Sequence, residues 1–392
     1  MKKSILFLIM ITLLSPTFGF PKKQSKIYSK TSIQADLIHL PKYFYKRFEG
    51  KIGKKYSIVM NFIRRDSIID GNYYNEKNGT PIYFNYGSRI DDHENFKIGE
   101  ETGKYDSSYM PILSGEFHGI FISDNKIEGY WKKSGTNVKL SFSLDEKYPE
   151  GSAAFSLKEY SKSFHKGWQS ADIDFLFPQI KNIYNKESNL LINSAIEKIF
   201  LKDYNRGERN RDWELYKEMM NDFINRYKEF VNDTSLPKDY KPMWQNSFTT
   251  NIIFNSNYIL ALENTEFRFE GGAHPITLFK YKNFDLKTGK EILLNDLFKT
   301  DYKNELDKIG EKIFRETYNI KPDESFEKAG YFIGKEGFHL NNNFSISKVG
   351  LLFRFEEYEI GPYVIGAPTV FIPYSEINNL INSNGVLAQF LK

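Results

Sequence analysis

The stretch FTTNIIFNSNYILALENTEFRF, residues 248–269, decides the fold class. Its two halves are rich in β-branched and aromatic residues, which favour strands. Asn255-Ser256-Asn257 separates the halves and is typical of a turn, because Asn and Ser side chains bond locally to the backbone. The pattern therefore predicts two strands that pair as a hairpin, Phe248–Phe254 and Ile259–Phe269.

Before this hairpin, apolar residues recur every three or four positions, which is the period of an amphipathic helix. The two stripes are Leu191, Ile192, Ala195, Ile196, Ile199 and Phe200, and Tyr216, Met219, Met220, Phe223, Tyr227, Phe230 and Val231. After the hairpin we expect a strand over Ile276–Leu286, a helix over Asp301–Tyr318, strands over Leu351–Phe355 and Val370–Pro373, and a short helix from Tyr374. Helices grouped between runs of strands indicate an α+β layer, not a parallel βαβ sheet.

Residues 46–148 carry short alternating runs separated by turn signals. Ile58, Met60 and Phe62 lie at every second position, and Asn78-Gly79 is a typical hairpin turn. Strands at this spacing predict an all-β module, an antiparallel meander closed into a barrel or sandwich. The predicted fold class is therefore α+β, with this meander followed by helices packed on an antiparallel sheet.

The first twenty residues have the layout of a secretory signal peptide. Lys2 and Lys3 precede an apolar run from Ile5 to Leu14, and Thr17-Phe18-Gly19 puts small residues at the −3 and −1 positions of a cut after Gly19. The alternative is a retained membrane anchor, but ten apolar residues span about 15 Å, half of the ~30 Å hydrocarbon core. We therefore expect a chain exported to the periplasm or the exterior, with no integral membrane segment after cleavage.

Pro149-Glu150-Gly151-Ser152 is the strongest signal for a domain boundary, because the hydrophobic period changes after it. The predicted organisation has five parts. They are a signal peptide over 1–19, a linker over 20–45, the all-β module over 46–148, and two α+β domains over 155–270 and 271–392.

Composition excludes several classes of protein. With 54 basic and 50 acidic residues the formal net charge is only +4, so we expect no nucleic-acid partner. The 34 Phe, 26 Tyr and 4 Trp among 392 residues can fill a large core, which excludes a disordered chain. There is no cysteine, which excludes disulfides, a thiolate nucleophile and Cys-ligated metal centres. The lack of cysteine also excludes a lipoprotein, whose processing site needs one.

Three motifs together resemble a bacterial extracytoplasmic domain family of unknown function. They are Glu270-Gly271-Gly272-Ala273-His274-Pro275, Asn283-Phe284-Asp285-Leu286-Lys287-Thr288-Gly289-Lys290 and Tyr358-Glu359-Ile360-Gly361-Pro362-Tyr363. This family occurs at the C-terminus of the lysozyme-sensing anti-sigma factor RsiV and in the non-catalytic part of the peptidoglycan deacetylase PdaC. The resemblance implies that 271–392 is this domain and 155–270 its companion domain, and that the function is recognition outside the cytoplasm.

Glu270-Gly271-Gly272-Ala273-His274-Pro275 is also the strongest local signal for a site. The glycine pair permits a tight turn, across which Glu270 and His274 could meet as a carboxylate–imidazole pair. The simpler interpretation, which we favour, is a structural turn whose histidine bonds to the backbone. The other five histidines are scattered, so we expect neither a metal site nor a cofactor.

A second group of candidates surrounds Tyr358. Glu357 and Glu359 would share one face of a strand and could act as paired acids on a glycan. The simpler interpretation is a polar strand end. Tyr358, Glu359 and Tyr363 are the residues that we predict to contact a ligand.

The predicted function is an exported cell-envelope recognition module that binds a lysozyme-like protein or a peptidoglycan glycan, and we expect no catalysis of its own. The alternative is an envelope hydrolase that acts on a glycan through Glu270 and His274 or through Glu357 and Glu359. A purely structural role is a third possibility, which the sequence does not separate from binding.

Overall fold

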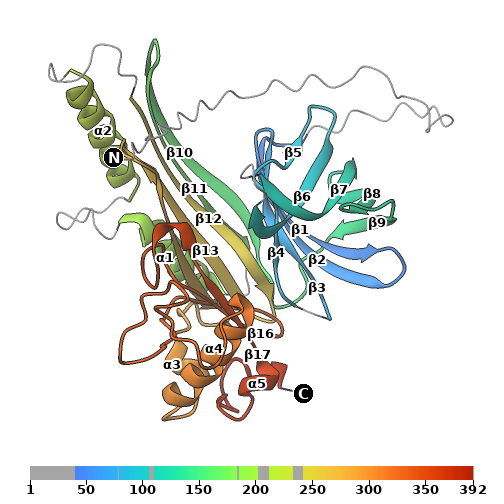
Figure 1. Cartoon of the computed structure of the whole chain (residues 1–392). Coiled ribbons are helices and arrows are strands. Elements are labelled where there is room, and N and C mark those ends of the chain that lie inside the picture. The colour runs from blue at the N-terminus through green and yellow to red at the C-terminus, as the bar shows by residue number, and fades with distance from the viewer. Residues whose placement is uncertain are drawn as a thin grey trace, which may run out of the picture. The chain divides into compact units, whose positions relative to one another are not determined.

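Three β-sheets organise the described part of the chain in the computed structural model (Figure 1). The structure describes residues 40–391 except 78, 106–109, 183–184, 202–211 and 233–241. The predicted signal peptide, 1–19, and the linker up to residue 39 therefore lie outside the described residues. Among the residues that are described, no helix is both long and apolar enough to span a membrane.

The first sheet is an antiparallel meander that closes on itself. Its strands are β1 (Tyr43–Ile52), β2 (Tyr56–Arg65), β3 (Ile68–Asn75), β4 (Ile82–Tyr83), β5 (Arg89–Ile90), β6 (Asn95–Tyr105), β7 (Pro111–Ser123), β8 (Lys126–Lys133) and β9 (Lys139–Glu146). Strand β1 pairs with both β2 and β9, and β2 also pairs with β3, so the ring of hydrogen-bonded strands is complete. The predicted all-β module is therefore a barrel.

Aromatic rings fill the barrel. Phe62 is fully buried and contacts the rings of Phe48, Phe96 and Phe121 at centroid distances of 5.5–6.1 Å. Gly119 of β7 is required by this packing, because a Cβ there would lie 2.4 Å from Phe96. Closely packed aromatic area of this kind supplies the hydrophobic stabilisation of a module without disulfides.

The second sheet has five strands in the order β10-β11-β12-β13-β14. They are β10 (Ala154–Lys166), β11 (Gln169–Asn182), β12 (Met243–Ser256), β13 (Ile259–Phe269) and β14 (Ile276–Asp285). The hairpin expected from residues 248–269 is formed by β12 and β13. The expected boundary between residues 270 and 271 falls between β13 and β14, which are paired in this one sheet.

Helices follow β11 and pack on the sheet. They are α1 (Lys186–Lys198), the short 3-10 helix η1 (Ile199–Leu201) and α2 (Asp212–Val231), and Figure 1 shows α2 against β10 and β11. Ile192 and Ile196 of α1 and Tyr216, Phe223 and Tyr227 of α2 are buried in the core beneath them, as both helical stripes predicted.

Strands β11 and β12 pair in parallel, whereas the other neighbours in this sheet are antiparallel. The pairing is parallel because α1, η1 and α2 carry the chain back across the sheet before β12 begins. The α+β prediction is confirmed, and it includes one βαβ connection that the sequence pattern did not indicate.

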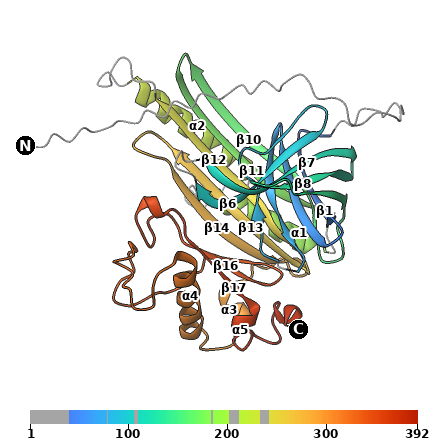
Figure 2. The same cartoon turned by 45° about the vertical axis from the view of Figure 1, so that its right-hand side comes forward.

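The third sheet has the order β15-β16-β17 and lies in the C-terminal part. The strands of this sheet are β15 (Phe344–Ile346), β16 (Gly350–Arg354) and β17 (Thr369–Pro373). The helices of the C-terminal part are α3 (Leu294–Leu297), α4 (Lys303–Tyr318), the 3-10 helix η2 (Tyr363–Ile365), α5 (Tyr374–Ile377) and the 3-10 helix η3 (Ala388–Phe390). Figure 2 shows α4 and α5 beside β17. Phe314 of α4 is fully buried at the centre of this core.

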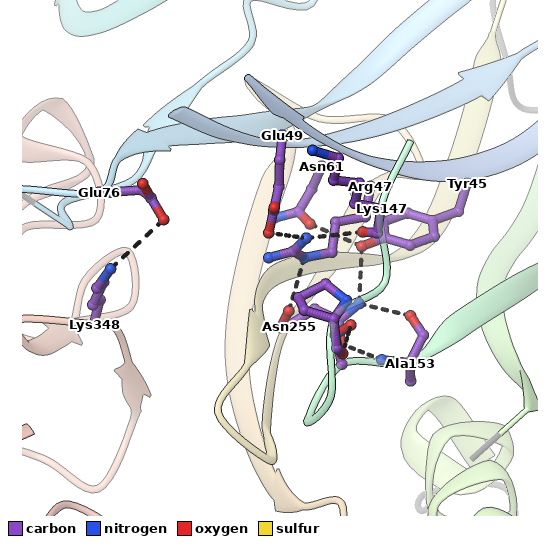
Figure 3. A network of polar contacts seen from close by, with 11 residues as sticks. Tyr45, Arg47, Glu49, Asn61, Glu76, Lys147, Ala153, Asn255 and Lys348 are labelled. Atoms are coloured by element: carbon purple, nitrogen blue, oxygen red, sulfur yellow. Dashed lines mark hydrogen bonds and ion pairs between the residues drawn. The ribbon is translucent and has the colours of Figure 1, made fainter. Parts of the chain in front are cut away.

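A network of polar side chains joins the barrel to the five-stranded sheet (Figure 3). Arg47, which is 1% exposed, donates from Nε to the carbonyl of Asn255 at 3.0 Å and from Nη1 to Glu49 at 2.6 Å. Asn61 donates to the carbonyl of Ile253 at 3.1 Å, and Tyr45 donates to the side chain of Asn61 at 2.8 Å. Buried polar groups at this junction are thus paired across the two sheets.

The loop before β15 is held to α4 by a buried carboxylate, and this contact has a pH dependence. Asp307 accepts from the backbone N–H of Leu340 at 3.0 Å and lies 2.8 Å from Nδ1 of His339. The hydrogen bond to Asp307 is the main cause that raises the pKa of His339 above its ordinary 6.5.

We expect His339→Gln to flatten the dependence of stability on pH. A histidine whose pKa is raised by folding stabilises the protein below its ordinary pKa, and this contribution is lost as pH rises through the folded value. The free energy of unfolding of the wild type should thus fall more between about pH 6 and about pH 8 than that of the variant. Urea denaturation at both pH values measures the difference, and equal slopes would contradict the role given to this contact.

Candidate functional site

His274 lies in the turn between β13 and β14 and contacts two tyrosines from the C-terminal part. Its ring stacks on Tyr363 with a centroid distance of 3.8 Å and an interplanar angle of 18°. Its Nδ1 lies 2.9 Å from the carbonyl of Pro275, which can only accept, so Nδ1 carries the proton. In the neutral imidazole the Nε2 atom then accepts from the hydroxyl of Tyr358, which lies 3.0 Å away. The structure therefore brings together His274, Tyr358 and Tyr363, all three of which the sequence singled out.

Exposed apolar side chains occur in the segments that carry this stack or bond to them. Val364 is 89% exposed and Tyr358 is 49% exposed. Phe332, which is 64% exposed, belongs to a segment whose backbone N–H at this residue donates to the carbonyl of Ile360 at 2.8 Å. We define the aromatic surface as the five residues His274, Phe332, Tyr358, Tyr363 and Val364.

Two carboxylates fix the segment that carries Tyr358 to the sheet. Glu357 accepts from the backbone N–H of Thr277 at 3.1 Å, and Glu356 accepts from that of Phe279 at 2.9 Å. These N–H groups belong to β14, the edge strand of the five-stranded sheet. An edge strand exposes unpaired N–H groups that favour aggregation, and these side chains cover them.

Glu359 has a different structural environment from Glu357. It accepts from the side-chain amide of Asn341 at 3.0 Å and from the backbone N–H of Glu356 at 2.7 Å. Tyr358 between them has a φ of 67°, so the chain is not an extended strand here and the alternation expected for Glu357 and Glu359 does not apply. Both carboxylates accept hydrogen bonds from the backbone around them, which is the behaviour of structural acids.

Glu270 lies on the face of the sheet that α2 covers. It accepts from Nη1 of Arg226 at 2.5 Å and from Nδ2 of Asn246 at 2.8 Å, whereas His274 bonds to Pro275 and Tyr358. Burial raises the pKa of Glu270, but the bonds from Arg226 and Asn246 lower it more, so this carboxyl has a pKa below its ordinary range. An acid of low pKa stays ionised at neutral pH and does not serve as a general acid.

A groove of about 270 Å³ opens beside Glu270, between the helices and the strands β11 to β14. We call it the sheet groove. Its lining consists of Ile173, Ile199, Phe200, Met219, Asp222, Phe223, Arg226, Asn246, Phe248, Asn264, Glu266, Arg268, Glu270, Leu278, Lys280 and Lys282. Among the four residues Glu270, His274, Glu359 and Tyr363, only Glu270 lines it.

Apart from Glu270, none of the polar residues that line the sheet groove was predicted from the sequence. One signal was present, because Asn264, Glu266, Arg268 and Glu270 are polar at every second position and alternate with Thr265, Phe267 and Phe269. Such a period places them on one face. Within the described residues, no group of three or more His, Asp or Glu side chains is arranged to hold a metal ion.

Two family models match consecutive parts of the chain. Residues 165–277, from the end of β10 to the start of β14, match the model described as Deacetylase PdaC. Residues 295–375, from α3 to α5, match the model described as Protein of unknown function (DUF3298). Consecutive regions of the chain are thus similar to PdaC and to the DUF3298 family, which confirms the predicted resemblance to the domains found in PdaC. The predicted relation to RsiV stays a prediction.

Similar proteins support the same assignment. Peptidoglycan-N-acetylmuramic acid deacetylase PdaC of Bacillus subtilis strain 168 is 26% identical over 145 residues, covering 36% of this chain. The match spans only 28% of that relative's length. The crystal structure of a DUF3298 family member from Bacteroides fragilis NCTC 9343 has a TM-score of 0.51 at 21% identity, covering 61% of this chain and 98% of that one. That structure supports the fold of the share of the chain that it covers.

Proposed function

We propose that this chain is an exported cell-envelope module that recognises another molecule through the aromatic surface and has no catalysis of its own. The observation that carries the proposal is the exposure of Val364, Phe332 and Tyr358 in the segments that carry the His274–Tyr363 stack or bond to them. Exposed apolar side chains gathered in one place mark interaction sites on soluble proteins. The location in the envelope is supported by the match to PdaC, whose name gives a peptidoglycan substrate.

A protein of the lysozyme type is the ligand class that this surface favours. Val364 and Phe332 are apolar, and apolar and aromatic side chains gather at the centres of protein interfaces. A glycan strand of the cell wall is the second class, supported by the exposed ring of Tyr358, because sugars stack on such rings. The predicted contact residues Tyr358 and Tyr363 belong to this surface, whereas Glu359 is held by Asn341 at its side.

We expect Val364→Asp to weaken binding about tenfold, because a charge would be buried where an apolar side chain was. Val364 is 89% exposed, so the fold should be unaffected. The measurement uses the chain without residues 1–19, with hen egg-white lysozyme in surface plasmon resonance and with insoluble peptidoglycan in sedimentation.

A matched control removes a similar stack from the barrel. Tyr130 stacks on His118 with a centroid distance of 4.8 Å, so Tyr130→Ala tests a histidine–tyrosine pair outside the aromatic surface. The affinity of this variant should change less than about twofold.

If neither lysozyme nor peptidoglycan is bound, or if both variants bind alike, the proposal is wrong. Release of soluble fragments from the peptidoglycan would favour the alternative hydrolase, and a substitution Glu270→Gln would then show whether Glu270 takes part.

A further inference from the structure

The sheet groove has a buried acceptor atom that the protein leaves free. Asn246 is 4% exposed, and its Nδ2 donates to the carboxylate of Glu270 at 2.8 Å. This contact fixes the orientation of the amide, because only the nitrogen can donate to a carboxylate. Its Oδ1 is buried and has no hydrogen-bond donor among the described residues. An unpaired buried acceptor costs about 1–3 kcal/mol, so a ligand donor at this atom would be favoured.

The end of the groove at Asn246 has an excess of negative charge. Arg226 lies within ion-pair distance of two carboxylates, Glu270 at 2.5 Å and Asp222 at 3.3 Å. The neighbouring Arg268 pairs with Glu266, so these two charges cancel. Asp222, Glu266 and Glu270 against Arg226 and Arg268 leave one negative charge in excess at this end, so a ligand ammonium group fits it better than a neutral donor does.

The other end of the groove carries two lysines of β14. Lys282 pairs with Glu291, whereas Lys280, on the same face, makes no ion pair with a carboxylate of the described residues. The carboxylate of Glu356 interacts with Lys280 electrostatically but is held by the backbone N–H of Phe279. Lys280 is exposed to solvent and lines the groove, so its ammonium is available to an anion. A carboxylate of a ligand is the group that this end would bind.

Strand register gives the separation of the two ends. Asn246 lies opposite Arg268, and Lys280 lies opposite Asn264, four residues further back along β13. At ~3.4 Å per residue along the strand and ~4.8 Å between strands, the two Cα atoms are about 17 Å apart. The side chains of Asn246 and Lys280 reach inward from the two ends, so the distance between their polar groups is shorter than this. An extended peptide of about three or four residues would bridge these groups, since each residue spans at most ~3.5 Å.

The wall between the two ends is apolar and accessible. Phe200 of η1, Met219 of α2 and Leu278 of β14 are half-buried and line the groove. Apolar side chains of a bound peptide would pack there, which contributes roughly 25 cal/mol per Å² of apolar surface removed from water.

From these observations we infer that the sheet groove binds a short peptide with a free N-terminal ammonium and a free C-terminal carboxylate. The ammonium would lie at Asn246 and Glu270, and the carboxylate at Lys280. Apolar side chains of the peptide would pack against Phe200 and Met219. The groove shares no residue with the aromatic surface. This binding site is thus separate from the recognition proposed above, and either can fail without the other.

Isothermal titration calorimetry with the tetrapeptide Ala-Leu-Leu-Ala tests the inference on the chain without residues 1–19. Two capped forms serve as probes: N-acetylation removes the ammonium and C-terminal amidation removes the carboxylate. We expect each cap to weaken binding about five- to tenfold, the range for a charge-assisted contact in a partly open site. Lys280→Gln should weaken binding of the free peptide by the same factor and leave the affinity for the amidated peptide unchanged. The substitution and the amidation remove the same interaction, so their effects should not add.

Lys290→Gln is the control. This exposed lysine follows β14 and does not line the sheet groove, so its loss should change the affinity less than about twofold. No binding of the tetrapeptide at ~1 mM, or equal affinity for the free and the capped peptides, would overturn the inference. So would an additive effect of Lys280→Gln and amidation, since it would place the carboxylate elsewhere.

Discussion

Phe314→Ala is expected to lower the free energy of unfolding by about 3–5 kcal/mol, the range for removing a buried aromatic ring and leaving a cavity. Phe314 is fully buried in α4, and its ring lies 5.0 Å from that of Tyr331 and 5.1 Å from that of Phe338. These neighbours belong to the loops between α4 and β15. Both rings are buried, and Phe338 also packs against Phe326 and Phe355, so most of the cavity term should remain. Chemical denaturation followed by tryptophan fluorescence and by far-ultraviolet circular dichroism measures the change.

The control for this prediction is Phe332→Ala in the same part of the chain. Phe332 is 64% exposed, so removing its ring should change stability by less than about 0.5 kcal/mol. The two variants delete the same atoms, so their difference isolates burial. A loss of under about 1 kcal/mol in Phe314→Ala would show that this core adapts to the cavity.

Arg47→Ala is expected to cost about 3–5 kcal/mol, because it breaks a buried charged network without removing the partners. The substitution leaves the carbonyls of Asn255 and Lys147 without the guanidinium N–H groups that reach them at 3.0 and 2.9 Å, and it leaves Glu49 without its ion pair. Figure 3 shows that these partners come from both sides of the junction. The barrel and the five-stranded sheet should therefore lose their cooperativity, seen as a broader denaturation transition.

Lys51→Ala is the control for Arg47→Ala. Lys51 is an exposed cation on the same strand, and its loss should stay within about 0.5 kcal/mol. Adding salt separates the two explanations of a loss at Arg47. A surface ion pair would be screened at ~1 M salt, whereas the cost of a buried contact should persist. A cost that disappears in salt would contradict the burial of this network.

Elements with a strong apolar period were predictable from the sequence. The expected helix Asp301–Tyr318 corresponds to α4 (Lys303–Tyr318), and the expected strand Ile276–Leu286 to β14 (Ile276–Asp285). In both, a buried apolar face opposes a polar one, and that periodicity determines which face is buried. The hairpin of β10 and β11 was not predicted, because β10 is an edge strand with many exposed polar residues, from Lys158 to Lys166.

The candidate sites were predictable only in part. His274, Tyr358 and Tyr363 stood out because of their motifs, but the stack that joins them spans almost ninety positions, and only the fold brings them together. The sheet groove was not found because η1, α2 and four strands each contribute a few residues to it. No short stretch of the sequence contains Arg226, Asn246 and Lys280 together.

Strand β14 also bears on how such proteins can recombine in evolution. The PdaC-type match ends at residue 277 and the DUF3298 match begins at residue 295, so most of β14 falls between them. Its inner edge pairs with β13, while Asn343 accepts from the N–H of Tyr281 at 2.8 Å and Asn283 donates to the carbonyl of Phe344 at 2.8 Å. A gene fusion that cut here would leave one half with an open sheet edge and the other with unpaired amides. Selection should therefore keep the two regions together as one unit in evolution. Other domains should be fused before or after this unit.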